Sequence, residues 1–109
     1  MRIWDLSPSR LCRNHLLGEH RELHAIWSVL TKNKKGYSRH PEVLRWKGRL
    51  KALYQRHELL VAEMSERGYI HKSPLDIKLA VGAARQKSFV NTYEEQVKNL
   101  RAKKCGCRV

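Results

Sequence analysis

The first thirty residues carry groups that together suit imine chemistry. Arg2 follows the N-terminal amine directly, and four ionisable residues come soon after it: His15, Glu19, Arg21 and Glu22. An α-amine has a reference pKa of about 7.7–8.0 against about 10.4 for lysine, so a larger fraction of it is neutral and nucleophilic at pH 7. A neighbouring carboxylate can move protons, and neighbouring arginines can hold phosphates.

Helical spacing decides which of these groups can act together. At 100° per residue, His15, Glu19 and Glu22 fall on one border of an apolar stripe. Partial desolvation at such a border raises the pKa of a carboxyl group toward the range that suits proton transfer. The competing interpretation is that Glu19 and Glu22 are ordinary border residues paired to arginines, and the spacing alone favours it.

Histidine and cysteine spacing gives only weak signals for a metal. His20 and His24 lie four residues apart and can share an ion, but Glu22 between them points elsewhere. The H-E-x-x-H pattern of zinc proteases does not occur in the sequence. Cys105 and Cys107 form a C-G-C that lacks a second ligand pair at zinc spacing. We therefore expect no metal and no cofactor.

The net charge indicates a polyanionic partner. Twenty-three Lys and Arg against ten Asp and Glu give +13 over 109 residues. The positive charge is clustered, with nine basic residues and one acidic residue over 32–56, and five basic residues over 98–108. Nucleic acid is the first partner that such clusters suit, and an anionic membrane is the second. Lys47 and Arg49, in the first cluster, are candidate DNA contacts.

Three helical stretches are expected to position these groups. The first begins near Ser7-Pro8-Ser9, breaks before Asn14 and runs to about Thr31. The second follows His40-Pro41 and ends near Gly68, with a regular apolar face. Its opposite face is strongly basic and consists of Arg45, Lys47, Arg49, Lys51 and Arg56.

The third helix is expected over about 84–103, after a connector over 69–83 that holds a short helical turn near 77–81. Its apolar stripe consists of Phe89, Tyr93, Val97 and Leu100. Alternation typical of strands never extends beyond a few residues in the sequence. We predict an all-α fold, a single small domain of three main helices with irregular connectors over 1–104, followed by a flexible tail over 105–109.

Cysteine usage and hydropathy suggest where such a protein works. Three cysteines are an odd number, which disfavours a disulfide framework and fits a reducing compartment. The apolar runs fall short of the roughly 20 residues that a membrane-spanning helix needs. We expect a monomer in the cytoplasm, associated with the nucleoid and not with a membrane.

The N-terminal pattern resembles the pyrimidine-dimer DNA glycosylase family, whose best-known member is the phage endonuclease V. The resemblance is densest over residues 2–30, in Arg2-Ile3, Leu11, His15-Leu16 and Glu19-x-Arg21-Glu22-Leu23. A looser match over 43–70 includes Glu66-Arg67-Gly68-Tyr69. The family is mainly helical, uses no metal, cuts the glycosidic bond of a damaged nucleotide and then breaks the backbone at the abasic site.

The resemblance implies a role for each matching residue. Met1 falls at the family's nucleophile position, where the α-amine attacks; Arg2 is too large for normal Met removal, so we expect Met1 to remain. Glu22 matches the catalytic carboxylate. Arg2 and Arg21 match phosphate-holding arginines, and His15 matches a histidine of the same site. The implied partner is double-stranded damaged DNA, and the implied activity is a glycosylase with abasic-site lyase activity on pyrimidine dimers or related damage.

Two departures from the family pattern keep an alternative open. Ala25 stands where the family has a further arginine, and the tail is basic where the phage enzyme has an aromatic-rich one. Both bear on lesion recognition more than on lyase chemistry. The alternative is a non-catalytic basic helical module that binds nucleic acid through the 32–56 and 98–108 clusters, with steep salt dependence and no covalent intermediate.

Overall fold

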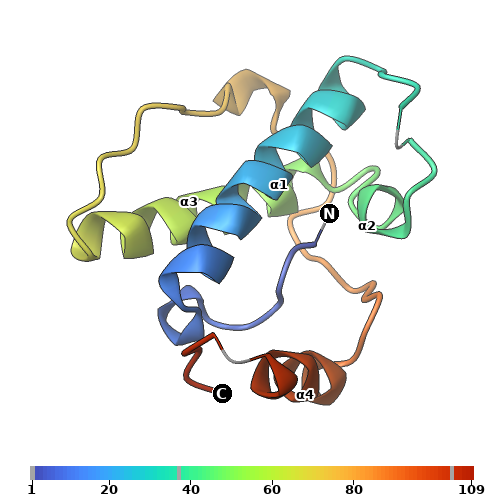
Figure 1. Ribbon diagram of the computed structural model, residues 1–109. Coiled ribbons are helices and arrows are strands. Elements are labelled where there is room, and N and C mark those ends of the chain that lie inside the picture. The colour runs from blue at the N-terminus through green and yellow to red at the C-terminus, as the bar shows by residue number, and fades with distance from the viewer. Residues whose placement is uncertain (1, 37, 104) are drawn as a thin grey trace.

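The computed structural model of the protein describes residues 2–36, 38–103 and 105–109, and in these ranges helices are joined by irregular segments (Figure 1). Its elements in chain order are η1 (Pro8–Arg10), α1 (Arg13–Thr31), α2 (Pro41–Leu44), α3 (Leu50–Glu66), η2 (Ile77–Leu79) and α4 (Tyr93–Ala102). The predicted all-α class is confirmed. Over the described ranges, the only β pairing is one isolated bridge between Arg49 and Gly82. The same ranges contain no helix long and apolar enough to cross a membrane.

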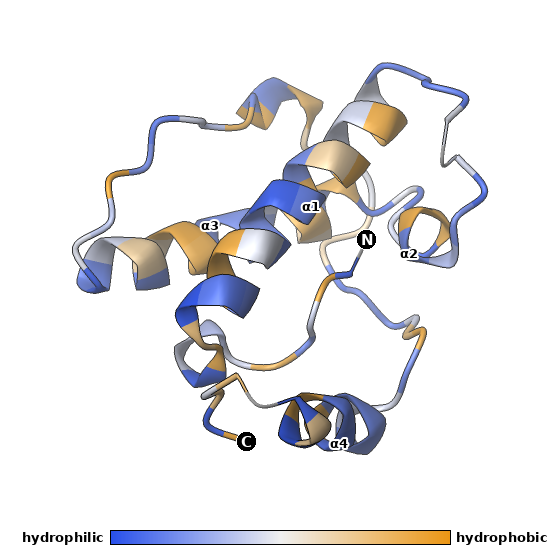
Figure 2. Cartoon of the chain, in the orientation of Figure 1, coloured by the Kyte–Doolittle hydropathy of each residue, from blue (hydrophilic) through white to orange (hydrophobic). Residues whose placement is uncertain are grey.

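The core forms where α1 packs against α3. Leu16 and Leu23 of α1 and Leu53 and Leu60 of α3 are each fully buried, at the helical spacing the sequence predicted. Burying each of these leucines contributes about 1.5–3 kcal/mol. Figure 2 shows the corresponding pattern on α1, where hydrophobic and hydrophilic patches alternate along the helix. The N-terminal segment adds two of the most buried side chains, Ile3 and Leu6, to the same core.

The first predicted helix has the expected break and the expected end. A short 3₁₀ turn, η1, carries Pro8 in its first turn, where the missing N–H costs nothing. Leu11 and Cys12 then adopt extended conformations, and α1 begins at Arg13. Cys12 is the N-cap of α1, so its extended conformation sets the direction in which α1 starts.

The second predicted helix is wrong as a single element. It divides into α2 and α3, joined by a tight turn over 45–49 in which Gly48 has a φ of +76°. Residues 81–83 pack against this turn: Val81 and Ala83 carbonyls accept from the N–H groups of Lys51 and Ala52. These bonds satisfy donors in the first turn of α3 that have no partner inside the helix, so the break is stabilised by a segment thirty residues away.

The third predicted helix is also shorter than expected, because α4 begins only at Tyr93. Thr92 and Glu95 form a capping box that defines this start. Residues 84–91 are not helical, since Gln86 and Ser88 instead bond to Arg45. The stripe predicted for this helix reduces to Val97 and Leu100, while Phe89 and Tyr93 are half exposed.

Residues 105–109, which we expected to form a flexible tail, return to the start of α1. The backbone N–H of Arg108 donates to the carbonyl of Arg10 at 2.7 Å. Cys107 and Val109 pack against the core. The tail's mobility remains a prediction, but its described residues have specific contacts with a segment about a hundred residues earlier.

Candidate functional site

A cavity of about 560 Å³ opens beside the N-terminal segment. Its walls come from that segment, from the first three turns of α1 and from the end of α4. The lining residues are Arg2, Trp4, Asn14, His15, Gly18, Glu19, Glu22, Asn99, Ala102 and Lys103. Four of the residues singled out in the sequence therefore meet at one cavity, namely Arg2, His15, Glu19 and Glu22.

Arg2 and Trp4 form one wall of this cavity. The guanidinium of Arg2 lies 4.3 Å from the centre of the Trp4 ring, and its Nη1 donates to Asn91 Oδ1 at 2.6 Å. Its Nε is buried, with no hydrogen-bond partner among the described residues. The Trp4 ring in turn meets His15 edge-on, with the ring centres 5.8 Å apart. Arg2 is thus held against the Trp4 ring at the wall of the cavity.

The two glutamates of α1 differ in what surrounds them. Glu19 is 2% exposed and receives two hydrogen bonds from Arg56, at 2.7 and 3.0 Å, and one from the backbone N–H of Trp4 at 3.0 Å. Burial raises its pKa, and the Arg56 charge opposes that rise. The arginine-paired interpretation therefore holds for Glu19. Glu22 is half-buried and lines the same cavity one turn later.

Three of the four remaining predicted site residues lie outside the cavity. Met1 is outside the described residues. Arg21 is exposed on α1, and Lys47 is exposed in the turn between α2 and α3. Arg49 is half-buried and donates to the carbonyl of Arg45 at 3.1 Å. Arg21, Lys47 and Arg49 do not line the cavity, so any contact they make with DNA would be outside it.

Sequence reasoning missed the contribution of α4 to the cavity. Asn99 and Lys103 line the same cavity as Arg2, although they come almost a hundred residues later in the chain. Lys103 belongs to the basic 98–108 cluster, and that cluster could have pointed to a phosphate-binding role. Asn99 has no feature in the sequence that would single it out. The Lys103 charge, after burial, also lowers the pKa of His15.

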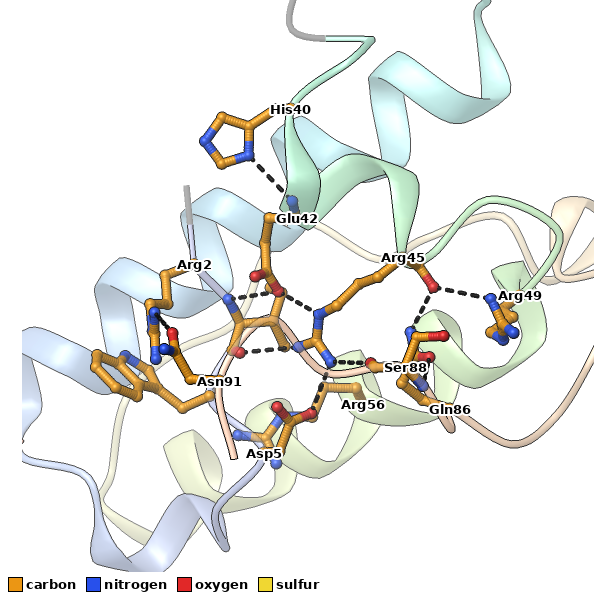
Figure 3. Close-up of polar contacts among 12 residues, drawn as sticks. Arg2, Asp5, His40, Glu42, Arg45, Arg49, Arg56, Gln86, Ser88 and Asn91 are labelled. Carbon is orange, nitrogen blue, oxygen red and sulfur yellow. Dashed lines mark hydrogen bonds and ion pairs between the residues drawn. The ribbon is translucent and has the colours of Figure 1, made fainter. Parts of the chain in front are cut away.

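A buried ion network holds the N-terminal segment that carries Arg2 (Figure 3). Arg45 donates to Glu42 at 2.6 Å, to Asp5 at 3.1 Å and to the carbonyl of Ile3 at 3.0 Å. Glu42 also accepts from the backbone N–H of Ile3 at 3.2 Å. The predicted basic face is thus wrong for Arg45, which is 6% exposed, and for Arg56, which pairs with Glu19. Lys47 and Lys51 remain exposed.

Two groups of metal-ligating side chains, distant in sequence, converge in the fold. His20 and His24 meet His57 and His71, and the Nε2 atom of His57 lies 3.2 and 3.1 Å from those of His20 and His24. Burial, followed by the charge of the neighbouring histidines, lowers the pKa of His20 to about 4.

The second group joins the start of α1 to the tail. It consists of Cys12, His15, Cys105 and Cys107. In the sequence, the C-G-C of the tail lacked a second pair of ligands at zinc spacing. The fold supplies that pair as Cys12 and His15, because the tail returns to the start of α1.

Comparison with known proteins gives one match. A family model described as pyrimidine dimer DNA glycosylase covers residues 1–77. This range includes the N-terminal segment, α1, α2 and α3 and stops before α4. Neither a curated protein nor a solved structure matches the chain.

Proposed function

The chain belongs to the pyrimidine dimer DNA glycosylase family, and from that premise we propose that it is a glycosylase and abasic-site lyase whose nucleophile is the α-amine of Met1. Membership of the family supports a glycosylase-type role in DNA repair. The observation that carries the finer proposal is the cavity that Arg2 and Glu22 both line. Arg2 is the residue that follows Met1 in the sequence, so the cavity opens at the start of the chain.

The proposed reaction begins with the neutral amine. Its nitrogen attacks C1′ of the damaged nucleotide, the bond between C1′ and the base nitrogen breaks, and the base leaves with the electron pair and acquires a proton. Glu22 assists opening of the sugar ring, so that the amine and C1′ form an imine. Glu22 then takes the proton from C2′, and the 3′ phosphate leaves by β-elimination.

The cavity supports this chemistry in two further ways. Its volume of about 560 Å³ suits a nucleotide turned out of the duplex. Arg2, whose Nε lacks a partner among the described residues, and Lys103 provide positive charge on two walls for the phosphates on either side of the lesion. His15 and Arg21 are proposed as further DNA contacts, with Lys47 and Arg49 beyond the cavity.

Borohydride trapping tests the proposal. Untagged protein is mixed with one duplex that carries an abasic site and another that carries a thymine dimer, and the imine is reduced to a stable covalent complex. We expect a complex with both duplexes, and peptide mapping should locate the link on the α-amine of Met1. Trapping on the abasic duplex alone would support the lyase and reject the dimer as substrate.

Two controls make the result decisive. Protein acetylated at its N-terminus should bind DNA and give no trapped complex, because the nucleophile is blocked. Full cleavage by the acetylated protein would overturn the proposed nucleophile. Salt-sensitive binding without trapping on either duplex would favour the non-catalytic module instead.

A further inference from the structure

The cluster at the start of α1 has the composition of a structural zinc site. Cys12 and His15 lie one helical turn apart, and Cys105 and Cys107 reach them from the tail. The ligand atoms of the four side chains lie within 4.8 Å of one another. All three cysteines are free thiols. Three sulfurs and an imidazole at one point are a donor set that protein structures use for Zn²⁺.

The distances within the cluster approach those of a tetrahedral ion. His15 Nδ1 lies 3.2 Å from Cys12 Sγ and 3.3 Å from Cys107 Sγ. With Zn–S and Zn–N bonds of about 2.3 and 2.05 Å, a tetrahedral site separates a sulfur from a nitrogen by about 3.6 Å. These two pairs therefore need to separate by only a few tenths of an ångström to hold an ion between them, and all four ligand atoms lie within 4.8 Å of one another.

The backbone around the cluster is arranged to present these ligands. Cys12 is the N-cap of α1, and its N–H donates to Cys107 Sγ at 3.1 Å, which holds that sulfur beside the first turn of α1. Gly106 has a φ of +88°, a conformation that glycine adopts readily and that lets the cysteines on either side face the same point. The Arg108 N–H to Arg10 carbonyl bond then holds the tail in place.

We propose that Cys12, His15, Cys105 and Cys107 bind one Zn²⁺ ion and that this ion attaches the C-terminal tail to the first turn of α1. Four protein ligands close the coordination sphere, so the site is structural and not catalytic. Coordination through Nδ1 of His15 leaves its Nε2 to carry a proton, so the residue remains a donor toward the cavity that it lines. The ion would thereby brace the cavity wall.

The histidine cluster is independent of the first and has the geometry of a second site. His57 is fully buried on α3, and its Nε2 faces both His20 and His24 of α1. The separations of 3.1 and 3.2 Å are close to the edge of about 3.3 Å that four nitrogens form around Zn²⁺. One lone pair on His57 cannot satisfy two neighbouring N–H groups, whereas one cation can accept all the lone pairs.

Two contacts complete this second cluster. Glu58 Oε1 lies 3.0 Å from His57 Nδ1, which fixes the proton on that atom and directs the Nε2 lone pair at the centre. His71, from the connector, supplies the fourth nitrogen. The geometry points to a divalent transition ion held by His20, His24, His57 and His71, with zinc as the ion that imidazoles suit best here.

Metal content measured by native mass spectrometry tests both sites. The full chain is prepared without a histidine tag, in a reducing buffer, and supplied with zinc. We expect two ions per chain, one after Cys107→Ser, one after His57→Gln, and none in the double variant. His40→Gln is the matched control, because His40 belongs to neither cluster, and it should retain both ions.

Cobalt substitution reports on the thiolate site in the wild-type protein itself. The measurement therefore remains informative even if a substitution prevents folding. Co²⁺ held by thiolates gives an intense sulfur-to-metal charge-transfer band in the near ultraviolet, and Co²⁺ held by imidazoles alone does not. We expect that band from the wild-type protein, with its loss in Cys107→Ser and its persistence in His57→Gln. No bound metal would overturn both proposals. The thiolate site would be overturned by a Cys12–Cys107 disulfide under reducing conditions, or by bound cobalt without the charge-transfer band. The histidine site would be overturned if the protein bound a single ion and lost it only with Cys107→Ser.

Discussion

The buried network around Arg45 and the cavity that Glu22 lines both depend on the N-terminal segment, but they use charge in opposite ways. In the network, Arg45 has acceptors from Glu42, Asp5 and two backbone carbonyls. In the cavity, Arg2 retains a buried Nε without a partner among the described residues, and Glu22 borders open volume. The first set of charges is enclosed by the fold and stabilises the N-terminal segment, whereas Arg2 and Glu22 line a cavity.

Removing Arg45 should have the largest effect on stability. Arg45→Ala leaves Glu42, whose side chain is 4% exposed, without its ion-pair partner. We expect a loss of about 3–5 kcal/mol in the free energy of unfolding, because the remaining carboxylate is a buried, uncompensated charge. Urea denaturation measures the change. Lys47→Ala, two residues later and exposed, is the control and should change stability by less than about 0.5 kcal/mol. A cost below 1 kcal/mol for Arg45→Ala would show that the network is not a scaffold.

Glu22→Gln should separate activity from stability. The substitution keeps the shape of the side chain and removes its ability to take a proton. We expect strand cleavage at an abasic site to slow by about 100-fold, or about 2.7 kcal/mol in the barrier. Single-turnover kinetics measures the rate, and Glu94→Gln, on the exposed face of α4, is the control. Equal rates for the two variants would remove Glu22 from the mechanism.

Glu19→Gln tests the boundary between the two regions, because Glu19 lines the cavity but pairs with Arg56. The variant leaves a largely buried guanidinium with a weaker acceptor. We expect a loss of about 1–3 kcal/mol in unfolding free energy and a fall in cleavage of less than tenfold per folded molecule. A fall in cleavage of more than tenfold per folded molecule would instead give Glu19 a part in catalysis.

Lys47 and Arg49 test whether exposure decides which basic residues meet DNA. Lys47→Ala should lower the slope of log K against log salt by about one, because an exposed lysine can neutralise one phosphate. Arg49→Ala should change that slope less and stability more, since Arg49 donates to the carbonyl of Arg45. Fluorescence anisotropy over a range of salt concentrations measures both slopes. Identical slopes for the two variants would contradict the assignment.

The smallest expected effect concerns the start of α4, whose other end lines the cavity. The Thr92 N–H and hydroxyl, as hydrogen-bond partners, lower the pKa of Glu95 below its ordinary value of 4.5. The contribution of the charged carboxylate is therefore complete above pH 4.5 and is lost as the pH falls through the lowered value. Glu95→Gln should make thermal stability slightly less dependent on pH in that acidic range. Circular dichroism at several pH values would show whether the two proteins differ.

The residues of α1 were the most predictable part of the molecule. A regular apolar spacing from Leu16 to Trp27, a break after the turn that holds Pro8 and an end at Thr31 were expected, and the structure confirms them. The boundaries of the other helices were less predictable. Gly48 at a positive φ breaks the second predicted helix, and the bonds from Gln86 and Ser88 to Arg45 delay the start of the third. Both depend on contacts between segments far apart in sequence.

The sequence by itself determined the helical class, the position of α1 and the family, because these follow from local periodicity and from a motif that is densest over the N-terminal segment and α1. Only the tertiary structure decided which charged residues are scaffold and which are exposed: Arg45 and Lys47 are neighbours in sequence, but one is buried and the other is not. It also decided which histidines and cysteines meet. Convergence of Cys12 with Cys107, or of His20 with His57, depends on long-range packing, and local spacing carries no information about it.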